Sequence, residues 1–177
     1  MRSEHLADGH EWLRIADPSW ENPLDPSFAA ASGGRWNPPH SFPTLYLNED
    51  VRTARFNLRL FIQGWPYEPE DLLDSTGPVL VHATVPRRQR VADAITSTGL
   101  AALGLRSSYP LDEAGSLIPH STCQPIGSSV KDAGLRGVKA TSARVPDRAG
   151  RELAWFPASS SSVARKLKVR SFSEWYW

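Results

Sequence analysis

The stretch Gly33-Gly34-Arg35-Trp36-Asn37-Pro38-Pro39 holds the residues of this chain best suited to bind a charged ligand. Two glycines allow a tight bend, and the guanidinium of Arg35 can bind a phosphate or carboxylate through two hydrogen bonds. Trp36 and, further along, Tyr46 can stack on a flat ring. A nucleotide combines such an anionic end with an aromatic end. The same residues also fit a structural turn with a solvated Arg35 and a core Trp36, because short motifs match by chance.

Motifs for several other chemistries are absent from the sequence. It contains neither Gly-x-x-x-x-Gly-Lys nor Gly-x-Gly-x-x-Gly, and the esterase motif Gly-x-Ser-x-Gly is also missing. His120 and Cys123 stand three residues apart, but two ligands are too few for a closed zinc site. We therefore predict no metal. Cys123 is the single cysteine, which leaves no intramolecular disulfide and agrees with a reducing compartment.

The composition is that of one ordinary globular domain. The 177 residues are 40% hydrophobic and 22% charged, which is enough to bury a real core. The formal net charge of +1 provides no overall basic field for nucleic acid. The N-terminus has no apolar stretch typical of a secretory signal, and no run is long enough to span a bilayer. We expect a cytoplasmic protein that binds neither membrane nor nucleic acid directly.

Short elements are predicted to position the candidate residues. A strand over residues 11–15 carries Arg14, a proline-rich irregular segment covers 17–31, and a buried strand over 45–47 carries Tyr46. A helix is predicted over 49–63 with Asn48 as its N-cap. Its apolar residues recur at helical spacing and leave Asn57 at the edge of the buried face. Asn57 can therefore face a cleft or be a satisfied boundary residue.

The rest of the chain adds further strands and two more helices. Strands are predicted over 79–85, 90–93, 137–140, 152–156 and 166–172, a short helix over 96–103, and a helix from Thr122 to Gly134. Because strands and helices do not alternate strictly, a doubly wound parallel sheet is disfavoured. We predict an α+β fold with a compact mixed sheet and a few helices. The single domain spans 1–177, with its core at about 10–172.

Four pieces of the sequence, in this order, resemble the RES domain, a family named for an arginine, a glutamate and a serine. They are Trp12-Leu13-Arg14-Ile15; Gly33-Gly34-Arg35-Trp36-Asn37 with Leu45-Tyr46-Leu47; Thr122-Cys123-Gln124-Pro125-Ile126-Gly127 with Gly134-Leu135-Arg136-Gly137; and Thr141-Ser142-Ala143-Arg144 with Gly150-Arg151-Glu152-Leu153-Ala154-Trp155-Phe156. The resemblance covers nearly the whole chain. It implies a fold similar to ADP-ribosyltransferases.

The resemblance also implies an activity and partners. RES proteins are typically toxins of toxin–antitoxin pairs that consume NAD by phosphorolysis or hydrolysis of the nicotinamide–ribose bond. No cofactor is implied, since NAD is the substrate and inorganic phosphate the candidate co-substrate. The antitoxin partner is usually an Xre-like helix-turn-helix protein that covers the cleft. Whether the chain forms a homo-oligomer stays open, as does the acceptor, which can be water, phosphate or a protein.

The resemblance assigns roles to single residues. Arg35 would hold the NAD phosphates or the attacking phosphate, and Arg14 would be a second basic contact. Tyr46 would contact the nicotinamide–ribose end. Further expected substrate contacts are Trp36 and Glu152, and the expected catalytic residues are Arg35, Tyr46, Asn57 and Ser142. Ser142 would be the motif serine, which either binds the ligand or shapes the site.

One position departs from the family pattern. The glutamate that usually sits on the helix after the Leu-Tyr-Leu strand aligns with Asn57, and an amide cannot supply negative charge. Loss of that charge could cost roughly 100-fold in rate, unless Glu49, Asp50 or Glu152 substitutes. The alternative function is therefore an NAD- or nucleotide-binding protein with weak or no turnover that acts as a sensor or partner-binding module.

Overall fold

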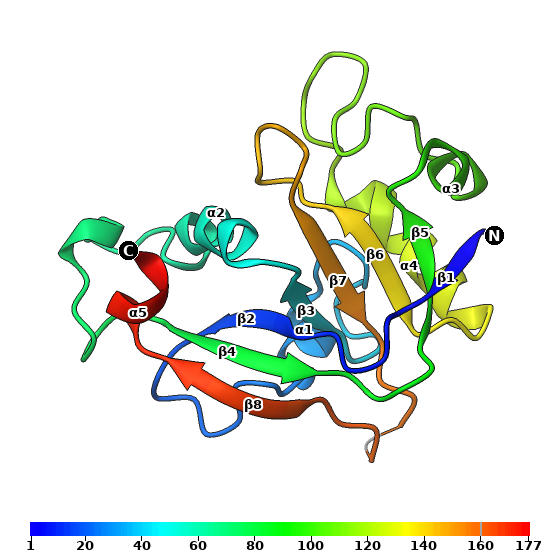
Figure 1. The fold of residues 1–177 in the computed structure, drawn as a ribbon. Helices are drawn as coiled ribbons and strands as arrows, with labels where there is room; N and C mark the ends of the chain where they lie inside the picture. The colour runs from blue at the N-terminus through cyan, green and yellow to red at the C-terminus, as the bar shows by residue number, and fades with distance from the viewer. Residues whose placement is uncertain (160) are drawn as a thin grey trace.

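The computed structural model describes residues 1–159 and 161–177, and these residues form one eight-stranded mixed sheet with flanking helices (Figure 1). The strands are β1 (Ser3–His5), β2 (Trp12–Ala16), β3 (Leu45–Asn48), β4 (Val79–Thr84), β5 (Arg90–Ala94), β6 (Gly137–Thr141), β7 (Arg151–Trp155) and β8 (Arg165–Arg170). The helices are α1 (Ser27–Ser32), α2 (Val51–Phe61), α3 (Ser97–Ala102), α4 (His120–Asp132) and α5 (Phe172–Tyr176), with a 3-10 turn at Pro69–Asp71. The expected α+β architecture is confirmed.

Strands distant in sequence are neighbours in the sheet. Their order is β1-β5-β6-β7-β3-β2-β4-β8. The β5–β6 pair is parallel, and the other pairs of described strands are antiparallel. Figure 1 shows β5, β6 and β7 crossing the direction of β2, β4 and β8, with β3 between the two groups. Strand β3 is therefore the join where elements from both halves of the sheet come together.

The register of β3 against β7 decides which side chains meet at this join. Tyr46 pairs with Ala154, and Asn48 pairs with Glu152. Since side chains alternate between the two faces of a strand, Leu45 and Leu47 point into the core while Tyr46 and Asn48 share the opposite face. Directly paired residues of antiparallel strands lie on the same face. Glu152 therefore joins Tyr46 and Asn48 on that face.

Helix α2 packs on β2 and β3 through the apolar face that its spacing predicts. Ala54, Leu58 and Ile62 are buried against Leu13 of β2 and Trp175 of α5. On the other half of the sheet, α3 packs on β5 and α4 packs on β6 (Figure 1). The two sets of helices thus flank the face that carries Tyr46, Asn48 and Glu152.

Several predicted boundaries are wrong. Residues 17–31 are not irregular throughout, because α1 begins directly after Pro26, whose ring is compatible with a helix start. The N-cap of α2 is Asp50, whose carboxylate accepts from the Thr53 amide at 2.6 Å, because pairing with Glu152 keeps Asn48 in β3.

The last two helices also differ from the prediction. Helix α4 begins at His120 rather than Thr122, which places Pro125 inside the helix. The aromatic tail, for which no element is predicted from the sequence, folds into α5 with Trp175 fully buried. In residues 1–159 and 161–177, none of the helices has the length and apolar character needed to cross a membrane.

Candidate active site

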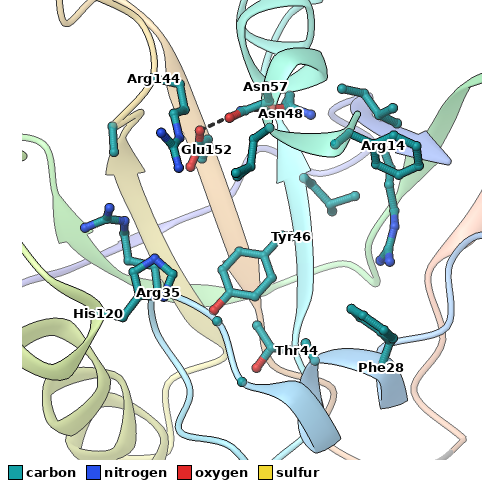
Figure 2. Close-up of a pocket in the computed structure, with 18 of the residues that line it drawn as sticks. Arg14, Phe28, Arg35, Thr44, Tyr46, Asn48, Asn57, His120, Arg144 and Glu152 are labelled. Atoms are coloured by element: carbon teal, nitrogen blue, oxygen red, sulfur yellow. Dashed lines mark hydrogen bonds between the residues drawn. The ribbon is translucent and has the colours of Figure 1, made fainter. Parts of the chain in front are cut away.

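A hollow of about 590 Å³ opens beside β3 and contains most of the residues expected to do chemistry (Figure 2). A volume of this size is typical of small-molecule sites. Its polar lining residues are Arg14, Asp17, Arg35, Thr44, Tyr46, Asn48, Asn57, His120, Arg144 and Glu152. Its apolar wall is formed by Ile15, Trp20, Phe28, Leu60, Phe61 and Trp65, among others. Arg35 and Tyr46, from separate segments, thus line one open space.

The glycine pair allows the loop to approach Tyr46 closely. Gly33 has φ of +76°, a conformation that favours glycine, and a Cβ there would lie 2.8 Å from the backbone nitrogen of Pro39. A Cβ on Gly34 would lie 2.4 Å from the Tyr46 hydroxyl oxygen. Any larger residue at position 34 would therefore displace the tyrosine or the loop that carries Arg35.

The Tyr46 hydroxyl holds this loop in place. It accepts a hydrogen bond from the Trp36 backbone N–H at 2.8 Å and donates to Oδ1 of Asn37 at 2.8 Å. The Asn37 amide in turn donates to the Ala29 carbonyl at 2.5 Å. Burial raises the pKa of Tyr46 well above its ordinary value, so the phenol stays protonated. The Tyr46 ring lines the hollow, while its hydroxyl group forms the hydrogen bonds that hold the loop.

One side of the hollow is positively charged. Figure 2 shows Arg35, His120 and Arg144 on the same side of Tyr46. Nη1 of Arg35 donates to the Ile118 carbonyl at 2.9 Å, which anchors the guanidinium. Burial, followed by the charges of Arg35 and Arg144, lowers the pKa of His120 below its ordinary value. At neutral pH the two guanidinium groups therefore supply the charge and His120 stays neutral.

A second cationic group lies across Tyr46 from the first (Figure 2). Burial lowers the pKa of Arg14 to about 10, against the opposing effect of Asp25. Its guanidinium carbon lies 5.9 Å from the centroid of the Trp20 ring. Nη1 of Arg14 is buried and has no hydrogen-bond partner among the described residues. Because a buried unpaired donor is costly, this nitrogen is suited to bind an anionic group of a ligand.

The carboxylate of Glu152 is held in the hollow by hydrogen bonds from Ser142 and Asn57. Oε1 of Glu152 accepts from Oγ of Ser142 at 2.5 Å. It also accepts from Nδ2 of Asn57 at 2.7 Å (Figure 2). The same Asn57 nitrogen donates to Oδ1 of Asn48 at 2.7 Å. Asn57 therefore faces the cleft, and Ser142 lies beneath the carboxylate, since it is 0% exposed.

The other two acids considered as substitutes for the missing glutamate form interactions elsewhere in the structure. Glu49 forms an ion pair with Lys139 at 2.9 Å and lines a separate, smaller hollow. Asp50 caps α2. Among Glu49, Asp50 and Glu152, only Glu152 lines the main hollow.

The expected contact between Trp36 and a ligand is wrong. Trp36 is 2% exposed and packs in the core, with its ring centroid 5.8 Å from that of Tyr109. The turn directs the indole inward because its backbone N–H is bound to Tyr46. The aromatic walls of the hollow are instead Trp20, Phe28 and further rings of α2 and the segment that follows it.

Several lining residues were not singled out as site residues from the sequence. Arg144 had a signal, since it stands two residues after Ser142 in the same motif. His120 was considered only as a metal ligand paired with Cys123, yet it lines the hollow. Trp20 and Phe28 lie in the proline-rich segment, where no periodicity marks the exposed face. No group of three or more His, Cys, Asp or Glu side chains that could hold a metal ion occurs within the described parts of the chain.

Comparisons with known proteins identify a family and a similar fold. The family model described as RES domain matches residues 10–176. Among solved structures, the chain is similar to the MbcT toxin in the crystal structure of the M. tuberculosis MbcT–MbcA toxin–antitoxin complex, with a TM-score of 0.73 and 19% sequence identity. The match covers 94% of this chain and 88% of that chain. The chain therefore shares the fold of that toxin. No curated protein matches the sequence.

Proposed function

The chain belongs to the RES domain family, and from this membership and the geometry of the cleft we propose that it cleaves the nicotinamide–ribose bond of NAD. We further propose that it is the toxin of a toxin–antitoxin pair. The observation that carries the proposal is the convergence of Arg35, Arg144, Arg14 and the carboxylate of Glu152 on one hollow around Tyr46.

This arrangement suits the chemistry of the proposed reaction. Cleavage breaks the bond between the ribose C1′ and the nicotinamide nitrogen, and the electron pair leaves with nicotinamide. Positive charge develops on the ribose, and a fixed carboxylate stabilises it more in the transition state than in the ground state. Guanidinium groups that bind the diphosphate hold the bond in position. Nicotinamide is a good leaving group, so no strong general acid is required.

The acceptor is water or inorganic phosphate. In either case an acceptor oxygen forms a new bond to C1′ and its proton passes to solvent. The products are nicotinamide and ADP-ribose, free or phosphorylated at that carbon. Arg35 and Arg144 lie on the same side of Tyr46 (Figure 2), and two guanidinium groups can bind a phosphate dianion.

Incubation of the purified protein with NAD, with and without inorganic phosphate, tests the activity. We expect release of nicotinamide, measured by chromatography. Arg144→Gln should raise KM by roughly 10- to 100-fold, since a charge-assisted contact is worth roughly 1.5–3 kcal/mol. Arg165→Gln, on the exposed strand β8, is the matched control and should leave KM unchanged. Absence of nicotinamide release under both conditions would exclude the activity.

The rim of the hollow supports the proposed antitoxin. Phe28 is 70% exposed and Trp20 is 40% exposed, and such apolar groups beside a cleft favour a protein partner. The structural neighbour is itself a toxin held in a complex with an antitoxin. We infer an Xre-like helix-turn-helix antitoxin that covers the hollow.

Induced expression in bacteria tests this role. We expect depletion of cellular NAD and growth arrest, and relief of both by the protein encoded in the adjacent reading frame. Growth that continues while the folded protein accumulates would contradict the toxin assignment.

A further inference from the structure

We propose that strand β7 supplies the catalytic carboxylate through Glu152, and that Asn57 of α2 is the residue that positions it. This inference rests on the proposed function and assigns its central charge. It reverses the expected roles, in which Asn57 was catalytic and Glu152 was a substrate contact.

The hydrogen bonds of Glu152 leave one oxygen for the ligand. Ser142 Oγ at 2.5 Å and Asn57 Nδ2 at 2.7 Å both donate to Oε1. Among the described residues, no hydrogen bond ends on Oε2, and Glu152 lines the hollow. One oxygen is therefore clamped from two elements, β6–β7 and α2, while the other can face the ribose. Such preorganisation is what electrostatic stabilisation of a developing cation requires.

The amide of Asn57 is matched to a carboxylate neighbour. Its Nδ2 donates to two acceptors, Oε1 of Glu152 and Oδ1 of Asn48, each at 2.7 Å. Because an ionised carboxylate accepts only, the amide nitrogen must face Glu152. A glutamate at position 57 would bring two carboxylates together, and two such groups cannot both stay ionised. The site therefore has room for one negative charge, and Glu152 carries it.

Asp17 is the other acid that lines the hollow, but its carboxylate is committed to its own turn. Oδ1 of Asp17 accepts from the Ser19 backbone N–H at 2.8 Å and from the Ser19 hydroxyl at 2.6 Å. Glu152 has no such local role. Its two donors, Ser142 and Asn57, lie 10 and 95 residues away in the sequence. This difference favours Glu152 as the functional acid.

The assignment predicts how kcat changes among variants of Glu152 and Asn57. Glu152→Gln removes the charge and should lower kcat for nicotinamide release by about 100-fold. Asn57→Glu should also lower kcat, because it adds a second carboxylate without the donor that holds the first. The double variant Asn57→Glu/Glu152→Gln restores one acid and one amide, and should recover at least tenfold in kcat over Glu152→Gln alone.

Three further measurements separate positioning from folding. Thermal melting of each variant reports whether it folds, and equilibrium binding of NAD reports whether the cleft is intact. In Asn57→Ala, kcat should fall by about tenfold while the dissociation constant for NAD stays within about threefold of the wild-type value; a merely structural role would lower the melting temperature and weaken NAD binding together. Glu49→Gln, outside the hollow, is the matched control and should keep the wild-type rate.

The outcomes distinguish this inference from the proposed function. If the wild-type chain releases no nicotinamide, both are overturned. If the wild type is active and folded Glu152→Gln keeps its rate within threefold, only the inference is overturned. If Glu152→Gln does not fold, Asn57→Glu decides: a variant slower than wild type supports the inference, and one as fast or faster overturns it.

Discussion

Replacement of Tyr46 by phenylalanine should destabilise the protein through the loop that carries Arg35. The hydroxyl makes two hydrogen bonds, to the Trp36 N–H and to Asn37 Oδ1, both at 2.8 Å. Asn37 is fully buried, so water cannot easily replace the lost donor. A buried group left unsatisfied costs about 1–3 kcal/mol. With two such groups, we expect a loss of roughly 2–4 kcal/mol in the free energy of unfolding.

Urea denaturation measures this loss, and Tyr109→Phe is its matched control. With a slope of about 2 kcal/mol per molar urea, the unfolding midpoint of Tyr46→Phe should fall by about 1–2 M. Tyr109 is equally a core phenol, but its hydroxyl has no hydrogen-bond partner among the described residues. Its replacement should change stability by no more than about 0.5 kcal/mol, because no bond is lost.

Kinetics test the second half of the reasoning. Trp36 and Asn37 follow Arg35 directly, so a loosened loop should misplace its guanidinium, and kcat/KM for NAD should fall by about tenfold or more. A Tyr46→Phe variant no less stable than Tyr109→Phe would refute the structural role of the hydroxyl. If that variant nevertheless lost activity, the hydroxyl would act on the ligand instead.

Three other predictions follow from single groups. NAD affinity should fall between about pH 9 and 11, because Arg14, with its pKa of about 10, loses its charge there; titration calorimetry should show no such fall in Arg14→Gln. Gly127→Ala should destabilise the protein by roughly 1–3 kcal/mol in urea, because the added Cβ would clash with the Trp36 carbonyl oxygen where α4 crosses the loop. Burial alone would raise the pKa of Asp93, but hydrogen bonds from Thr96 outweigh this effect and lower the pKa. The wild type should therefore have a larger free energy of unfolding than Asp93→Asn at neutral pH. This difference should shrink as the pH falls below about 4.

Local patterns were sufficient for most of the strands and for the longer helices, but not for β1, α1 and α5. The apolar character of 45–47 predicts a strand that carries Tyr46, and the structure has Leu45 and Leu47 in the core and the tyrosine in the hollow. The helical spacing after that strand places Asn57 beside the buried stripe, where it faces the cleft. This second inference needs only the period of the helix.

Strand pairing and the direction of side chains in turns could not be derived in this way. Nothing local indicates that β7 lies beside β3, so Glu152 could not be preferred over Glu49 from the sequence. Trp36 was expected at the ligand because a tight turn allows either direction for its indole. The bond between its N–H and Tyr46 decides that direction, and this bond joins separate segments.

The bond between Asn57 and Glu152 spans 95 residues, and this separation has a consequence for protein synthesis. Arg14, Arg35 and Tyr46 leave the ribosome before Asn57, whereas the acid on β7 emerges 95 residues after Asn57. A nascent chain can hold the cationic parts of the site but not its negative charge. The complete charge pattern therefore arises only once β7 has inserted between β6 and β3, so an unfinished copy would lack the proposed activity while it is still attached to the ribosome.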